Sequence, residues 1–398
     1  MTTHIIKEGI NSVGVQNPNL RVFDIIMQTE FGTTYNAYVV QGDKKTALIE
    51  TSHSKFFDEY FENVSSICDL KNVDYVVLNH TEPDHSGSLR RILEINPNII
   101  VVATVAGTNN IKQITNMEFK SQIARDGDVI DLGGKTLKFL VAPMLHWPDS
   151  MFTYVEEDEV LFSCDFLGAH YCETKLFDKY VTQKENYDKA FAYYYAAIFG
   201  PFKSAVLNGL DKIKNLKFDT VCTSHGPVLT DSVKECIDKY REWSSEAVNL
   251  KNDPKEVSIF YVSAYGCTRQ MASIAKEVIE NKGMKCRTFD VIKSDMGEIK
   301  EAIDTSDAIM LGTPTINRDA LKPIWDVIST IDAVWNRGKN VGVFGSFGWS
   351  GEGVPMVVNR INDLKLKAFE NGFKACFVPS DDEINGMKTY TEKFIELI

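Results

Sequence analysis

The chain has 398 residues, of which 44% are hydrophobic and 25% charged, and its formal net charge is −12 at pH 7. This length allows two or three domains with full cores, and the acidic balance argues against nucleic acid or an anionic membrane as main partner. No apolar stretch approaches the roughly 18 residues of a membrane span, and no export signal is visible. The eight cysteines form no CxxC pair, which argues against a zinc ribbon or a thioredoxin-type motif. Because no export signal is visible, we expect them to be reduced thiols in a cytoplasmic protein.

Short apolar runs separated by turns fill the first two-thirds of the chain, to about Asn252. The runs are NAYVVQG, KTALIET, DYVVLN, NIIVVAT, KTLKFLVAP, SMFTYVEED, EVLFSCD and DTVCTSH. Helix-like segments lie at 55–67, 87–95 and 108–114, followed by a helical, aromatic stretch at 184–214 and a further helix at 231–250. Strands in runs, with helices inserted, predict two packed sheets covered by helices.

A charged break with a proline, residues 251–255, separates this part from the remainder and predicts domains 1–252 and 256–398. Beyond the break, strands alternate regularly with helices. The expected strands are VSIFYVSA, CRTFDVI, AIMLGTP, NVGVFGS and KACFVPS, and the expected helices lie at 268–281, 296–305, 322–331 and 354–371. This βα alternation predicts an α/β domain with a doubly wound parallel sheet.

The segment HTEPDHSG follows directly after the apolar run DYVVLN and carries four potential metal ligands: His80, Glu82, Asp84 and His85. Loops at strand ends are where a rigid scaffold usually presents chemistry. Two converging carboxylates would repel each other unless positive charge lay between them, and a pair of divalent metal ions is the simplest source. For this octapeptide alone, a solvated polar turn that contains two histidines is the competing interpretation.

Three further candidate ligands end later apolar runs: His146, Asp165 and His225. Four of the seven histidines in the chain occupy such positions, which is hard to assign to chance. Seven ligands suit two metal ions that share one carboxylate. Imidazole and carboxylate ligands without thiolate fit iron, manganese or zinc.

The order HxExDH, then His, Asp and His, resembles the metallo-β-lactamase-like domain of the flavodiiron proteins, also called A-type flavoproteins. By that resemblance one iron would be held by His80, Glu82 and His146, the other by Asp84, His85 and His225, with Asp165 as the bridge. Hydrolases of the superfamily usually carry a histidine in place of Glu82, and the added negative charge favours a redox-active iron. Members differ in whether the residue matching His85 binds iron, so that ligand stays open.

Two residues outside this ligand set are candidates for a catalytic role. The run YYYAAI at 193–198 resembles a family segment that brings a tyrosine near the open face of the irons, and we single out Tyr195. An aromatic core stripe on a helix is the alternative for these tyrosines. His170, five residues after Asp165, is a candidate for supporting the ligands or supplying a proton, or else an ordinary core or surface histidine.

The second domain opens with a strand, a loop containing glycine and hydroxyl groups, and then a helix, which together make a phosphate site. No GxGxxG fingerprint is present, and SAYGCT instead resembles the FMN-phosphate loop of flavodoxins. Two later loops follow strands at the sheet edge that binds ligands, and Trp349 is either a stacking partner of the flavin or a surface tryptophan. The candidate FMN contacts are Ser263, Ala264, Tyr265, Gly266, Cys267, Thr268, Thr313, Pro314, Thr315, Ile316, Asn317, Ser346, Phe347, Gly348, Trp349, Ser350 and Gly351.

The resemblance covers essentially the whole chain and implies FMN and two iron ions as cofactors. The expected activity is reduction of dioxygen to water, of nitric oxide to nitrous oxide, or both. Electrons would come from a separate donor, with a rubredoxin as first choice and a reduced deazaflavin coenzyme as second. The family also implies a head-to-tail homodimer, or a homotetramer built from it. A dizinc hydrolase with an appended flavodoxin domain and a non-catalytic electron carrier are the competing functions.

Overall fold

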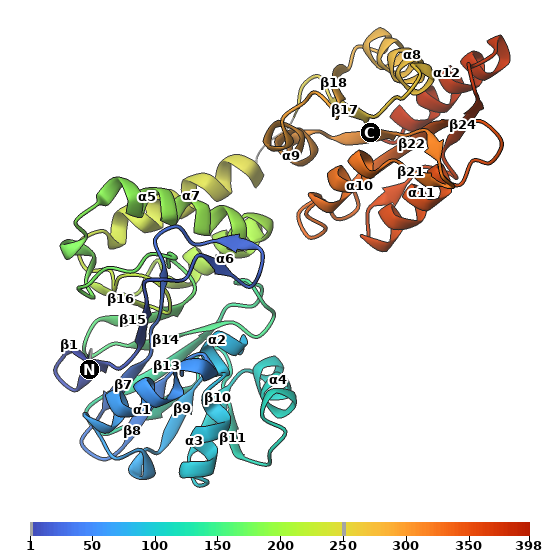
Figure 1. Cartoon of the computed structure of the whole chain (residues 1–398). Helices are drawn as coiled ribbons and strands as arrows, with labels where there is room; N and C mark the ends of the chain where they lie inside the picture. The colour runs from blue at the N-terminus through green and yellow to red at the C-terminus, as the bar shows by residue number, and fades with distance from the viewer. Residues whose placement is uncertain (1–2, 249–251) are drawn as a thin grey trace. The chain divides into compact units, whose positions relative to one another are not determined.

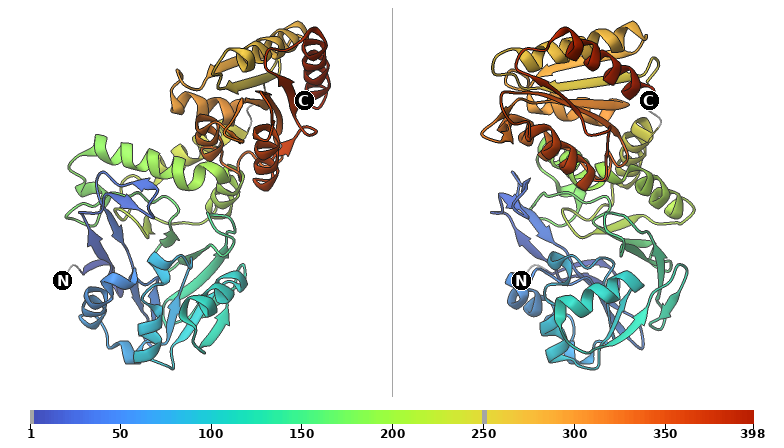
Figure 2. Two further views of the ribbon diagram at one scale, coloured as in Figure 1. Left: turned by 45° about the vertical axis from the view of Figure 1, so that its right-hand side comes forward. Right: turned by 90° about the vertical axis from the view of Figure 1, so that its right-hand side faces the viewer.

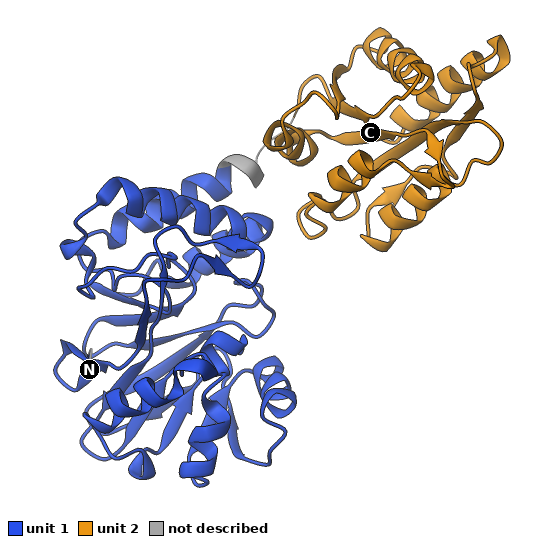
Figure 3. Cartoon of the chain, in the orientation of Figure 1, with its two compact units in different colours: residues 1–248 blue, residues 249–398 orange. Residues whose placement is uncertain are grey.

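The structure, a computed structural model, describes residues 3–248 and 252–398. The chain forms two compact units, Met1–Val248 and Asn249–Ile398 (Figure 3). The break predicted at 251–255 lies partly outside the described residues, because Lys251 is not among them. The same holds for the last two residues of the helix predicted at 231–250.

Two β-sheets pack face to face at the centre of the first unit (Figure 1). The larger sheet runs in the order β1 (His4–Lys7), β2 (Ile10–Ser12), β7 (Tyr38–Gln41), β8 (Thr46–Ile49), β9 (Tyr75–Val77), β10 (Ile100–Ala103) and β11 (Lys120–Ile123). The smaller sheet runs in the order β12 (Val129–Asp131), β13 (Thr136–Val141), β14 (Met151–Val155), β15 (Val160–Cys164) and β16 (Thr220–Thr223). Pairing is parallel from β8 to β11 and between β15 and β16, and otherwise antiparallel.

A layer of helices covers the outer face of each sheet (Figure 1 and Figure 2). The larger sheet carries α1 (Phe57–Ser65), α3 (Leu89–Ile95) and α4 (Val105–Thr115); the smaller carries α5 (Lys184–Tyr194), α6 (Lys203–Ile213) and α7 (Val233–Val248). Val76 of β9 faces the helices, whereas Tyr75 and Val77 face the other sheet. Because both faces are covered, the strands read as continuous apolar runs. The four layers confirm the metallo-β-lactamase-like αββα sandwich.

Along the chain, the segment between β2 and β7 forms two small antiparallel strand pairs, which were not predicted from the sequence. They are β3 (Val15–Asn17) with β6 (Thr33–Tyr35), and β4 (Val22–Phe23) with β5 (Met27–Gln28). At the tip of the second pair, Asp24 and Ile25 have φ values of 47° and 69°. Positive φ at consecutive tip residues is what a tight hairpin turn requires.

A parallel sheet forms the centre of the second unit, which confirms the predicted doubly wound architecture. Its strands run in the order β18 (Lys285–Asp290), β17 (Glu256–Tyr261), β19 (Ala308–Gly312) and β22 (Asn340–Phe347), and β22 then pairs with both β23 (Lys367–Ala368) and β24 (Phe373–Cys376). One face packs against α8 (Cys267–Asn281) and α12 (Asp381–Ile395), the other against α9 (Met296–Thr305), α10 (Lys322–Ser329) and α11 (Gly353–Asp363). This order is that of flavodoxins.

One helix of the second unit is shorter than the sequence predicted, and another was missed. The helix expected at 354–371 ends at Asp363, because Lys365 turns into the left-handed region with φ 64° and the chain then enters β23. The missed helix, α12, begins with a capping box between Ser380 and Glu383.

In the part of the chain that the structure describes, no helix combines the length and apolar character that crossing a bilayer requires.

Candidate metal centre and flavin pocket

The seven predicted ligands meet at one edge of the first unit, where strands of both sheets end. His80 follows β9 of the larger sheet, while Asp165 and His225 follow β15 and β16 of the smaller one. The connection from β13 to β14 supplies His146. Part of HTEPDHSG is helical rather than a loop: α2 (Pro83–Ser86) begins at Pro83, which suits the first helical position. This turn carries Asp84 and His85.

The ligand atoms fall into two groups, each with its members within 4.8 Å of one another. The first group contains His80, Glu82, His146 and Asp165, and the second contains Asp84, His85 and His225. In the first, Glu82 Oε2 lies 3.1 Å from His80 Nε2 and 3.2 Å from His146 Nε2. In the second, Asp84 Oδ2 lies 3.0 Å from His225 Nε2 and 3.4 Å from His85 Nε2.

Asp165 lies between the two groups and turns one carboxylate oxygen to each. Its Oδ2 atom is 3.8 Å from His80 Nε2 and 3.6 Å from His146 Nε2. Its Oδ1 atom is 3.1 Å from His85 Nε2 and 3.4 Å from His225 Nε2. This is the geometry of a carboxylate that bridges two metal ions.

The spacing and burial of these atoms fit two cations. Metal–ligand bonds of about 2.1 Å place neighbouring ligand atoms roughly 3.0–3.4 Å apart, close to the separations seen here. Over the described residues, both oxygens of Asp84 and of Asp165 and the Nε2 atom of His85 are buried without a hydrogen-bond partner. Buried carboxylates are costly unless they are paired or bind metal. The donor set therefore fits a dinuclear centre.

Without metal, the cluster would instead hold protons on His80, His85 and His146, whose pKa values are raised. Burial lowers the pKa of His80, but hydrogen bonds with Asp149 and Glu82 outweigh it and raise that pKa to about 10. Burial raises the pKa of Asp165, but the neighbouring His85 and His146 bring it well below its usual range. Bound metal ions would take the place of these protons.

The outer ring nitrogens of three predicted ligand histidines face acceptors that were not predicted from the sequence. His80 Nδ1 lies 3.2 Å from Asp149 Oδ2, and His225 Nδ1 donates to the Thr34 carbonyl over 2.6 Å. His85 Nδ1 lies 4.0 Å from Glu50 Oε2. Such outer contacts orient metal ligands. Glu50 directly follows the apolar residues of β8, so looking for potential ligands at the ends of apolar runs, as for His80, would also identify it.

Another missed residue is Asp24, at the tip of the β4–β5 hairpin. Its exposed carboxyl group lies beside that of Glu82. Partial desolvation and the neighbouring Glu82 carboxylate raise the pKa of Asp24 to about 6. Glu82 and His146 are also the more exposed ligands, with 17% and 13% of their side chains accessible. This side of the cluster is therefore the one open to solvent.

His170 lies beside the second ligand group. Its Nδ1 atom is 2.8 Å from Thr33 Oγ1. The centroid of its ring lies 4.4 Å from that of Phe23 and 5.0 Å from that of His225. Burial and the adjacent His225 hold the pKa of His170 well below its usual range, so its ring is neutral. The structure thus places His170 against a predicted ligand.

Tyr195 turns toward a helix rather than toward the ligands. It begins the π-helical turn η4 (Tyr195–Phe199), and its hydroxyl group shares a hydrogen bond of 2.7 Å with Ser244 Oγ. The preceding residue, Tyr194, instead packs against the histidines, with its ring centroid 4.9 Å from that of His170 and 6.2 Å from that of His225. Among the described contacts, Tyr194 is the tyrosine of this run that touches the histidine cluster.

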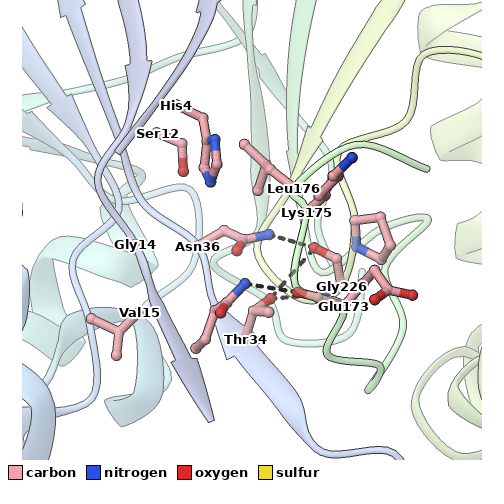
Figure 4. A pocket seen from close by; sticks show the side chains of 12 residues that line it. His4, Ser12, Gly14, Val15, Thr34, Asn36, Glu173, Lys175, Leu176 and Gly226 are labelled. Carbon is pink, nitrogen blue, oxygen red and sulfur yellow. Dashed lines mark hydrogen bonds between the residues drawn. The ribbon is translucent and has the colours of Figure 1, made fainter. Parts of the chain in front are cut away.

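A small polar cavity borders the segment that carries His225 (Figure 4). Thr34, Asn36 and Gly226 line it, and Asn36 donates a hydrogen bond of 2.8 Å to the Gly226 carbonyl. Its volume of about 20 Å³ suits about one water molecule. Hydrogen bonds from Asn36 thus hold the His225 loop, and the cavity itself is too small for an organic substrate.

A pocket of about 610 Å³ lies at the carboxyl edge of the second sheet. Its lining contains these predicted FMN contacts: Ala264, Tyr265, Cys267, Pro314, Thr315, Ile316, Asn317, Ser346, Phe347, Gly348, Trp349 and Ser350. Arg318, Phe377 and Val378 also line it and were not predicted as contacts, although the last two lie in the predicted strand run KACFVPS, directly after β24. The aromatic walls and the volume fit a flavin ring.

The five predicted contacts outside this lining are Ser263, Gly266, Thr268, Thr313 and Gly351. Ser263 Oγ accepts hydrogen bonds from the backbone N–H groups of Gly266 and Arg269, at the start of α8. Gly266 has φ 89°, and a Cβ atom there would meet nothing within 4 Å. An open helix N-terminus with free backbone approach fits a phosphate group.

The comparisons with known proteins agree with this two-site arrangement. The model of the ODP family beta lactamase matches residues 33–226, and the flavodoxin model matches residues 259–388. The flavo-diiron protein FprA2 of Clostridium acetobutylicum is 50% identical over 99% of both chains. The anaerobic nitric oxide reductase flavorubredoxin of Aliivibrio salmonicida is 35% identical over 95% of this chain and 76% of its own.

Solved structures give the same result for the fold. Rubredoxin oxygen:oxidoreductase from Desulfovibrio gigas superimposes with a TM-score of 0.69 at 26% identity, covering 100% of this chain and 98% of that one. The flavodiiron protein from Giardia intestinalis gives 0.67 at 25% identity with the same coverage. Fold and site thus define an oxidoreductase that uses FMN and a diiron centre. The chain belongs to the flavodiiron protein family.

Proposed function

We propose that this chain reduces dioxygen to water, nitric oxide to nitrous oxide, or both, with electrons from a separate rubredoxin-type donor. Asp165 carries this proposal, because its two oxygens each face one of two complete ligand groups. The names of the relatives support both substrates, since one is a nitric oxide reductase and another a rubredoxin oxygen:oxidoreductase. Dioxygen takes up four electrons and four protons to give two water molecules. Two nitric oxide molecules take up two of each to give nitrous oxide and one water.

The proposed ligand assignment follows the two groups. One iron is assigned to His80, Glu82 and His146 and the other to Asp84, His85 and His225, with Asp165 shared. When bound, the two irons supply one-electron chemistry at adjacent positions, and FMN supplies electrons in pairs. The carboxylates of Glu82 and Asp84 offset part of the charge of each ion. We assign this centre to the domain 1–252 and FMN to the domain 256–398.

Residues around the ligands shape the reaction site. The exposed edge at Glu82 and His146 is the side from which a small gas molecule would approach. On the opposite side, His170 and Tyr194 pack against His225 and keep bulk water from that ligand. In the second unit, Trp349 and Tyr265 would stack on the flavin, while the α8 N-terminus would hold its phosphate. A head-to-tail homodimer, or a tetramer built from it, would bring the two cofactors of different subunits together.

The test is anaerobic turnover with chemically reduced rubredoxin, comparing dioxygen and nitric oxide consumption by iron-loaded protein. We expect about two irons and one FMN per chain, and His146→Ala should lose at least ten-fold in both rates while it keeps its FMN. His4→Ala, which changes a histidine of β1 outside the ligand groups, is the matched control.

Other outcomes would support the competing functions. Unchanged gas consumption in His146→Ala would favour an electron carrier. Two zinc ions without iron, together with hydrolase turnover, would favour a dizinc hydrolase.

A further inference from the structure

A buried carboxylate faces the metal centre from the strand next to β9. Glu50 follows β8 directly and is 1% exposed. Its Oε1 atom accepts a hydrogen bond of 2.9 Å from the backbone N–H of Asn79, which fixes the side chain. Its Oε2 atom is buried and has no hydrogen-bond partner in the described part of the chain. The free oxygen lies 4.0 Å from His85 Nδ1.

The backbone beside Glu50 also holds His85. The backbone N–H of Thr51 donates a hydrogen bond of 3.0 Å to the His85 carbonyl, and the Thr51 hydroxyl group donates a second, short one. Glu50 itself has φ 61°. A left-handed conformation is strained for a residue with a side chain, and such strain concentrates at functional sites. The end of β8 therefore contacts both the backbone and the ring of His85.

The chemistry of imidazole requires an acceptor at this position. If Nε2 of a neutral imidazole gives its lone pair to a metal ion, Nδ1 must carry the proton. A buried N–H group needs an acceptor. Two groups lie near His85 Nδ1: Glu50 Oε2 and, at 3.8 Å, Cys164 Sγ. A carboxylate is the stronger acceptor, and a shift of about 1 Å would bring it to hydrogen-bond distance.

Two other predicted ligand histidines, His80 and His225, provide a pattern within the same site. Asp149 faces His80 Nδ1, and the Thr34 carbonyl accepts from His225 Nδ1. In each case an acceptor outside the ligand groups fixes which ring nitrogen is free for the metal. Glu50 stands in the equivalent place for His85 and has no other described partner for Oε2.

We infer that Glu50 is a positioning residue of the metal centre, which holds the His85 ring in the tautomer whose Nε2 faces the second ion. The inference rests on the proposed two-metal function and deepens it. It assigns His85 as a ligand, the point on which members of the family differ. It also assigns a use to a buried carboxylate outside the ligand set.

The experiment measures metal binding, so that its result does not depend on turnover. Metal-free full-length protein is titrated with Co²⁺, and the two ions are followed by their visible absorption. In Glu50→Gln, which keeps the shape but removes the charge, we expect the affinity for one of the two ions to fall about 10- to 100-fold. His85→Ala should weaken the binding of the same ion, whereas the spectrum of the other bound ion should stay as in the wild type.

Two further variants keep the result interpretable. Glu50→Asp retains a shorter carboxylate and should bind with intermediate affinity, which also covers the case that Glu50→Gln does not fold. Cys164→Ala removes the competing acceptor and should bind both ions as the wild type does. Wild-type affinity in Glu50→Gln, or a loss in Cys164→Ala alone, would overturn the inference. Loss of gas reduction in a wild-type protein that binds both ions would instead overturn the proposed function.

Discussion

Both proposed metal positions share the carboxylate of Asp165. It is 2% exposed, and each oxygen lies within 4 Å of two ligand histidines. A bridging carboxylate supplies negative charge to both ions at once, so its neutralisation affects two sites rather than one.

We therefore expect Asp165→Asn to lower the iron content well below two per chain, because the amide keeps the shape but not the charge. The FMN content should stay unchanged, since FMN is assigned to the other domain. Metal analysis and flavin absorbance measure both quantities on the same sample. Asp126→Asn, which breaks an exposed ion pair with Lys212, is the control. An Asp165→Asn protein with two tightly bound irons would contradict the bridging role.

For single residues, the sequence predicts which side chains are potential ligands better than it predicts the directions in which side chains point. His80, Asp165 and His225 were foreseeable, because each follows an apolar run that became a strand. The choice of Tyr195 rests on a family pattern, and the hydroxyl contact with Ser244 depends on the π-helical turn that the sequence does not reveal.

At the scale of elements, Asp178 connects the loop before α7 to the rest of the first unit. Its carboxylate accepts hydrogen bonds from the backbone N–H groups of Thr230 and Ser232, at 3.0 and 2.8 Å, and from the Ser232 hydroxyl group. Burial raises the pKa of Asp178, but these bonds outweigh it and the pKa is lowered from 3.8. A folded-state pKa below the unfolded value means stability that is present above pH 3.8 and lost as the pH falls through the folded value.

Asp178→Asn should accordingly lower the free energy of unfolding by about 2 kcal/mol near neutral pH, because the charged hydrogen bonds become neutral ones. The difference from the wild type should shrink as the pH falls below about 4, where the wild-type carboxylate also takes up a proton. Calorimetric unfolding of both proteins from about pH 7 down to about pH 2, a range that extends below the usual pKa of Asp, measures this. A difference that stays constant with pH would show that the charge of Asp178 is not the cause.

Element boundaries show where local sequence signals suffice. The start of α12 was foreseeable, because Ser380 and Glu383 form the S-x-x-E pattern of a capping box. The end of α11 was not, since a lysine at 365 gives no sign of the left-handed backbone that stops the helix. Strands of two or three residues, such as β3 and β4, carry too few positions for any period to appear.

At the scale of the whole molecule, the two cofactor sites use separate sets of residues in separate units. Gly266 offers a way to disturb one alone. Its φ of 89° lies in the left-handed region, which an alanine adopts at a cost of about 1–2 kcal/mol, while the added Cβ would meet nothing within 4 Å.

Gly266→Ala should weaken FMN binding by about ten-fold through this backbone cost, since 1.4 kcal/mol corresponds to a factor of ten. The iron content should remain as in the wild type. Fluorescence of the flavin released on dilution measures the affinity. Gly283 also has a positive φ, 80°, but does not line the pocket, so Gly283→Ala controls for backbone strain alone. Equal FMN affinity in Gly266→Ala and the wild type would contradict the assigned phosphate site.

The placement of the ligands on both sheets has a mechanical consequence for the first unit. His80 extends from the larger sheet, and Asp165 and His225 extend from the smaller one. Two metal ions bound between them would therefore join two layers that otherwise adhere mainly by apolar contact, with a few hydrogen bonds such as that from Tyr38 to the Thr223 carbonyl. The metal centre then acts as a removable cross-link, and its binding energy adds to the cohesion of the sandwich by mass action. Separating the sheets requires releasing the metals, so resistance to unfolding would follow metal supply even when no electrons flow.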